Sequence, residues 1–142
     1  RPFDAIHSID SLDLLQKVDA AALDSHRQPS LLVQVDLAGE STKFGAAPDE
    51  ARAIVAAAAT LKAARLVGLM TLPPLFEDPE ATRPYFRRLR AFRDELVAGG
   101  RPPDWLRELS MGMSHDLEVA ISEGATMVRV GTAIFGRRTG TP

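Results

Sequence analysis

The fold is decided by two adjoining stretches of the sequence, LSMGMSHD at residues 109–116 and VRVGTAIFG at residues 128–136. Each begins with apolar residues typical of a short buried strand and continues into glycine and a hydroxyl residue, where a helix is expected to start. Backbone N–H groups at a helix start lack partners within the helix, and the helix dipole attracts an anion to the same place. The stretch from Ser110 to Gly136 is therefore predicted to bind a phosphate group.

The rest of the chain alternates short apolar runs with amphipathic stretches. Strands are expected at residues 5–9, 31–37, 66–71, 106–111 and 127–130, and helices at 12–23, 48–62 and 84–98, with a short helix capped by Ser114. This alternation predicts a parallel sheet, either in a barrel or in a doubly wound fold. A barrel needs eight strands and roughly 250 residues, so this chain of 142 residues would make about half of one.

Composition excludes several classes of function. The net charge of −2 argues against a nucleic-acid partner, and without cysteine neither disulfides nor thiolate metal sites can form. No apolar run approaches the ~20 residues that a membrane span needs. The histidines His7, His26 and His115 lack the spacing of metal ligands. We therefore expect a cytoplasmic protein with no metal site.

Small and hydroxyl residues at two strand ends carry the predicted chemistry. Gly112 and Gly131 allow the backbone to approach a bound group closely, and Ser114 and Thr132 add hydroxyl donors. Either motif alone is also typical of ordinary cap and turn residues. Both together favour the phosphate site, because parallel strands present their carboxyl ends at one edge of the sheet.

Arg129 lies between Val128 and Val130 in the last strand, so we expect its side chain to be largely enclosed. An enclosed charge needs a partner. That partner could be the nitrogen of a heteroaromatic ring or a carboxylate in a structural ion pair, and the pattern alone leaves both open. A second basic group is expected to lie on the solvated face of the helix at 84–98: Arg83, Arg87, Arg88, Arg90 and Arg93.

The two opening stretches, with AI at 120–121 and GAT at 124–126, closely resemble the signature of the pyridoxal phosphate homeostasis protein family. The resemblance extends through GLMT at 68–71, QVD at 34–36 and HSID at 7–10, and so covers essentially the whole chain. It implies a (β/α)8 TIM barrel of the alanine racemase N-terminal type. The barrel's cofactor would be pyridoxal 5′-phosphate.

The resemblance also implies roles for single residues. Ser114, Gly131 and Thr132 would hold the phosphate, and Met111 and Met113 would lie near the cofactor.

By the same likeness, Arg129 would lie near the pyridine nitrogen. An arginine there keeps that nitrogen largely unprotonated and weakens the cofactor as an electron sink.

One feature of the family is missing from the sequence. The cofactor's Schiff-base lysine belongs to a Val-Ser-Lys segment at the end of the first barrel strand, whereas the lysines here are Lys17, Lys43 and Lys62. Residues 1–142 are therefore expected to be the C-terminal half of a single barrel domain, with the N-terminal strands and their lysine absent.

The resemblance implies a carrier that stores or delivers pyridoxal phosphate within the cell, without robust catalysis. Its expected partners are the cofactor and pyridoxal-phosphate-dependent apoenzymes, and the full-length protein is expected to be a monomer. The alternative is a racemase-like enzyme. Such an enzyme needs a second base, usually a tyrosine from a further domain, and the only tyrosine here, Tyr85, falls on a helix. A third reading is a phosphate- or nucleotide-binding domain unrelated to pyridoxal.

Overall fold

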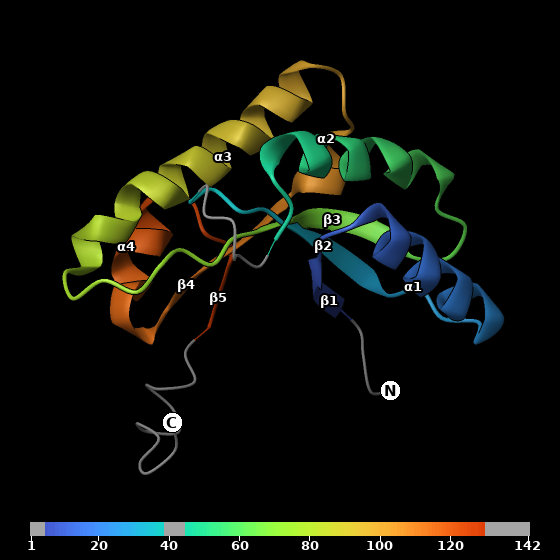
Figure 1. The fold of residues 1–142 in the computed structure, drawn as a ribbon, viewed down its shortest axis with the longest axis horizontal. Helices are drawn as coiled ribbons and strands as arrows, with labels where there is room; N and C mark the ends of the chain where they lie inside the picture. The colour runs from blue at the N-terminus through green and yellow to red at the C-terminus, as the bar shows by residue number, and fades with distance from the viewer. Residues whose placement is uncertain (1–4, 39–44, 130–142) are drawn as a thin grey trace, which may run out of the picture.

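The computed structural model describes residues 5–38 and 45–129 of the chain (Figure 1). Within them the strands are β1 (Ala5–Ile9), β2 (Ser30–Gln34), β3 (Arg65–Met70), β4 (Glu108–Met113) and β5 (Met127–Arg129). The α-helices are α1 (Leu12–Asp24), α2 (Pro48–Ala57), α3 (Arg83–Ala98) and α4 (Leu117–Ser122). Short 3-10 helices are η1 (Ala58–Thr60), η2 (Pro79–Thr82), η3 (Pro103–Leu106) and η4 (Ser114–Asp116).

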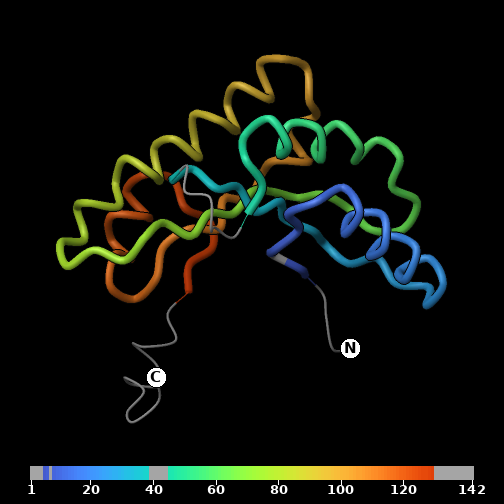
Figure 2. Tube along the Cα trace, viewed as in Figure 1, coloured from blue at the N-terminus to red at the C-terminus, as the bar shows by residue number. Residues whose placement is uncertain are grey.

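The order of the strands separates the two folds that the sequence allowed. All neighbouring strands are parallel and follow one another as β1-β2-β3-β4-β5. A doubly wound sheet reverses its strand order at a switch point, whereas a barrel adds each strand beside the one before. Figures 1 and 2 show the curled sheet with the helices along one side of it. The prediction of a partial barrel is confirmed.

The helices form where the local sequence favours them. The Ser11 hydroxyl caps α1 by accepting a hydrogen bond from the Leu14 N–H at 3.0 Å. Pro48 opens α2, with Asp49 and Glu50 in its first turn. The predicted apolar face of α3 is buried against the sheet: Phe86, Leu89, Phe92 and Leu96.

The two faces of the strands have different surroundings. In β2 and just after it, alternate residues Leu31, Val33 and Val35 join the hydrophobic core with the helices. Gln34 therefore lies on the opposite face, in register with Met70 of β3. Met70 in turn pairs with Ser110 of β4. All members of this row (Gln34, Met70 and Ser110) are buried.

Three details differ from the sequence predictions. The strand predicted at 106–111 begins later than expected. Residues 103–106 form η3, and β4 begins at Glu108. α2 ends at Ala57 and passes into η1. The arginines of α3 are also not merely solvated, since each donates a hydrogen bond to another residue: Arg83, Arg87, Arg88, Arg90 and Arg93.

None of the helices within residues 5–38 and 45–129 has the length and apolarity to span a lipid bilayer.

Candidate functional site

The carboxyl ends of β4 and β5 bring three of the predicted site residues together. Arg129 at the end of β5 pairs in register with Met113 at the end of β4, and Ser114 follows Met113 directly. The other two predicted phosphate ligands, Gly131 and Thr132, lie outside the described residues. The structure therefore places Met113, Ser114 and Arg129 at the same edge of the sheet.

Gly112 allows the chain to turn from β4 toward α4. Its φ of +102° lies in the left-handed region, and a Cβ added there would lie 2.4 Å from the Cβ of Ala120 in α4. Packing of the strand end against α4 is thus sufficient to require glycine at this position. This contact also brings α4 close beneath the turn that contains Ser114.

Asp116 fixes the turn between β4 and α4. Its carboxylate accepts a hydrogen bond from the Met113 N–H at 2.7 Å, and the residue is only 8% exposed. The N-cap of α4 is Asp116, so the expectation that Ser114 caps this helix is wrong. Ser114 instead begins η4. Because α4 spans only Leu117–Ser122, its dipole is short, and an anion bound here would depend mainly on nearby N–H and hydroxyl groups.

The two methionines of the predicted site lie in different surroundings. Met111 is 2% exposed and belongs to the hydrophobic core with Leu109, on the helix-facing side of β4. Met113 is 42% exposed at the edge of the sheet. Met113 is therefore accessible to a ligand, whereas Met111 packs in the core between β4 and the helices.

Arg129 is exposed, which corrects the expectation that its valine neighbours enclose it. The end of its guanidinium group is nevertheless partly buried against Met70, with Nη2 3.6 Å from the sulfur. This burial lowers the pKa of Arg129 below its ordinary value, although an arginine remains charged at neutral pH. Across residues 5–38 and 45–129 no carboxylate forms an ion pair with it. The structural ion pair that the sequence allowed is absent from this part of the protein.

A cavity of about 340 Å³ opens beside the turn. One wall is the loop after β3, from Thr71 through Pro73 and Pro74 to Phe76, and the other is the segment from Gly112 to Asp116. Its volume falls within the range of small-molecule sites. The sequence indicated Thr71 only as the end of a predicted strand, because the contact between the two loops depends on tertiary structure.

Glu123 anchors α4 to α3 and was not expected from the sequence. Its side chain is buried, and its carboxylate accepts hydrogen bonds from Arg83 at 2.6 Å and Arg87 at 3.1 Å. These interactions, led by the Arg83 hydrogen bond, lower the pKa of Glu123. Nη2 of Arg90 lies 3.6 Å from Oε1 of the same carboxylate. The spacing of these arginines along one helix was the available signal, but the sequence did not identify the acid that they share.

Arg88 connects α3 to the segment that follows β2. Its guanidinium donates to the Leu37 carbonyl at 2.7 Å, near the end of the segment that follows β2. α3 is thus linked both to the loop after β2 and to the end of α4.

Comparison with known proteins agrees with this architecture. Residues 2–139 match the family described as "Alanine racemase, N-terminal domain". The pyridoxal phosphate homeostasis protein of Aquifex aeolicus is 44% identical over 133 residues, which cover 94% of this chain and 58% of the relative. The Escherichia coli protein of the same name is 37% identical over 140 residues, covering 96% and 57%. The chain thus spans little more than half the length of these relatives.

Solved structures give the same result. PipY of Synechococcus elongatus with pyridoxal phosphate bound is 38% identical, with a TM-score of 0.83, covering 94% of this chain and 61% of PipY. An alanine racemase of Clostridium difficile has a TM-score of 0.72 at 19% identity and is similar in fold. Together with the sequential parallel strands, these matches identify the chain as a member of the alanine racemase N-terminal domain family.

Proposed function

We propose that the full-length protein binds pyridoxal 5′-phosphate and stores or delivers it in the cell, without robust catalysis of its own. The observation that carries this proposal is the position of Arg129. A guanidinium with no carboxylate partner in the described part of the chain lies beside the strand end that carries Ser114. A charged donor next to a hydroxyl-bearing turn fits a ligand that combines a heteroaromatic nitrogen with a phosphate. The names of the relatives and the ligand of PipY support the same choice.

In this proposal, Ser114, Gly131 and Thr132 bind the phosphate, Arg129 faces the ring nitrogen, and Met113 contacts the cofactor. Met111 contributes through the core behind the strand.

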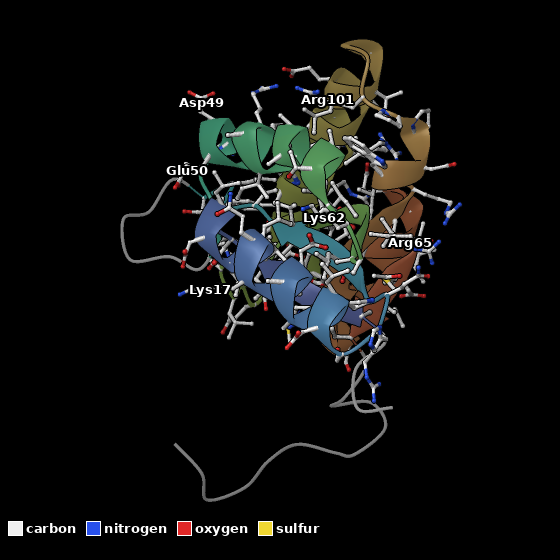
Figure 3. All side chains as sticks on the ribbon, turned by 90° about the vertical axis from the view of Figure 1, so that its right-hand side faces the viewer. Lys17, Asp49, Glu50, Lys62, Arg65 and Arg101 are labelled. Carbon is white, nitrogen blue, oxygen red and sulfur yellow. The ribbon has the colours of Figure 1, made fainter. Side chains whose placement is uncertain are left out.

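We further propose that residues 1–142 form the C-terminal half of one barrel domain, whose preceding strands supply the Schiff-base lysine. The relatives are longer than this chain. Of the lysines within the described ranges, Lys17 lies on the outer face of α1 beside Asp13, as Figure 3 shows for the labelled Lys17. Lys62 precedes β3, at the opposite edge of the sheet from Ser114. Neither lysine lies at the carboxyl ends of the strands.

The finer parts of the proposal concern the whole protein. It would act in the cytoplasm as a monomer and transfer the cofactor to apoenzymes that depend on it. The racemase-like alternative draws on the fold of the Clostridium enzyme alone.

The test is to purify the full-length protein and measure its visible absorbance after adding pyridoxal phosphate, together with alanine racemisation. A lysine-bound cofactor with negligible turnover supports the proposal, and robust racemisation overturns the carrier role. Ser114→Ala and Thr132→Ala should each weaken cofactor retention. The exposed Thr60→Ala is the matched control. If binding survives loss of both hydroxyls unchanged, the phosphate cradle is wrong.

A further inference from the structure

Gln34 ends β2 with a buried side-chain amide whose N–H donor has no acceptor among residues 5–38 and 45–129. The residue is 4% exposed, and its Nε2 makes no hydrogen bond within the part of the chain that the structure describes. Buried polar groups in folded proteins are nearly always paired, and leaving one unpaired is costly. An unpaired amide at the carboxyl end of a barrel strand is available to donate to an acceptor on a ligand.

The position of Gln34 places it on the same side of the sheet as Arg129. Val33 and Val35 belong to the helix-facing core, so the side chain between them lies on the opposite face. Met70 is its register partner on β3, and the sulfur of Met70 lies 3.6 Å from Nη2 of Arg129. Gln34 of β2 and Arg129 of β5 therefore both lie beside Met70 of β3.

Gly45 restricts where the Gln34 amide can lie. A Cβ added to Gly45 would lie 3.2 Å from Cγ of Gln34 and 3.0 Å from the Asp36 backbone nitrogen. The Gly45 φ of +112° also favours glycine. Backbone thus packs directly against the stem of the glutamine and restricts how this side chain can turn.

The chemistry of pyridoxal phosphate identifies a matching acceptor, on the basis of the proposed function above. The phosphate arm and the ring nitrogen lie toward one edge of the ring, and the phenolic oxygen lies on the opposite edge. If β4 and β5 hold the phosphate and the nitrogen, the phenolic oxygen is directed across the sheet toward β3 and β2. We propose that Gln34 donates a hydrogen bond from Nε2 to this oxygen and so positions the ring.

The experiment uses the full-length protein and compares wild type with Gln34→Met. Methionine has a similar size and no donor, so the apo protein should unfold at an unchanged or higher temperature, because an unpaired donor is removed. Affinity for pyridoxal 5′-phosphate, measured by fluorescence titration, should fall about tenfold, as expected for one hydrogen bond to a charged acceptor. The control is Gln16→Met on the exposed face of α1, which should change neither quantity.

A second ligand tests which oxygen is involved. The analogue 3-deoxypyridoxal 5′-phosphate lacks the phenolic oxygen, so wild type and Gln34→Met should bind it equally well. A tenfold loss that persists with the analogue would overturn the assignment. So would unchanged affinity for the natural cofactor, or a lowered unfolding temperature of the apo variant, which would indicate a structural role. If wild type itself fails to bind pyridoxal phosphate, the proposed function is overturned, and this role with it.

Discussion

The Asp116 carboxylate and the Met113 N–H are joined across 2.7 Å by a hydrogen bond that closes the turn between β4 and α4. Asp116→Ala should lower the free energy of unfolding by about 1–2 kcal/mol, because a partly buried N–H loses its charged acceptor. Asp116→Asn, which keeps an acceptor oxygen, should cost less. The free energy of unfolding of both variants is measured by urea denaturation. The control is Asp104→Ala, whose side chain is 91% exposed, and an equal loss in that variant would contradict a special role for the turn.

Gly112→Ala should be destabilising for two reasons. The new Cβ would meet the Cβ of Ala120 at 2.4 Å, and alanine tolerates the left-handed backbone poorly. We expect a loss of about 2–4 kcal/mol. Adding Ala120→Gly removes the clash but weakens the helix by about 1 kcal/mol. A double-mutant cycle should therefore show the combined variant to be more stable than the sum of the single losses predicts. Simple additivity would mean that the two residues do not press on each other.

Asp19 should make stability depend on pH in the acid range. Burial raises the pKa of its carboxyl, but the N–H groups of Ala63, Ala64 and Lys62 outweigh this effect and leave the pKa below its ordinary value. A lowered folded pKa gives stability that is present above the unfolded value of about 3.9 and is lost as the pH falls through the folded value. Asp19→Asn should cost no more than about 1 kcal/mol at neutral pH, because the carboxylate is only partly buried and solvent screens its charge.

The Asp19→Asn difference should disappear as the pH is lowered, which thermal unfolding between neutral and acid pH can follow. Asp13→Asn serves as the control, since Asp13 is 74% exposed and forms a surface ion pair with Lys17. A difference that is constant across the pH range would show that shape, rather than charge, matters at Asp19.

Arg129→Ala should separate binding from folding. Within the described residues its side chain forms one hydrogen bond, to the Met70 sulfur, so the unfolding temperature should hardly change. Affinity for pyridoxal phosphate should fall about tenfold, with partial recovery in Arg129→Lys, because lysine keeps the charge without the planar fork. Arg65→Ala is the control. Arg65 is exposed at the start of β3 (Figure 3), at the opposite end of the strands from Ser114. Equal affinity of Arg129→Ala and wild type would remove Arg129 from the site.

Much of the fold could be predicted because local pattern and tertiary structure agree. The amphipathic helix at 84–98 and the alternation of helices with parallel strands both follow from short-range features, whereas the strand order became clear only from the tertiary structure. The start of β4 was misplaced, because Leu106 looks equally apolar in a 3-10 turn and in a strand. Periodicity cannot distinguish the two over so few residues.

The sequence predicted where in the fold the candidate site lies, but not the exposure and contacts of its residues. The adjacency of Met113, Ser114 and Arg129 follows from parallel pairing, which the sequence order implied. The exposure of Arg129 did not, because enclosure depends on what covers a strand rather than on its neighbours in the chain. Glu123 and Gln34 were missed for a related reason. A shared acid and an unpaired amide are recognisable only once distant segments meet.

The contacts of α3 connect two separate parts of the chain. Through Arg88 it holds the Leu37 carbonyl on one flank, and through Arg83 it holds Glu123 on the other. Substitutions in α3 should therefore disturb both attachments at once, although none of its residues belongs to the proposed cofactor site.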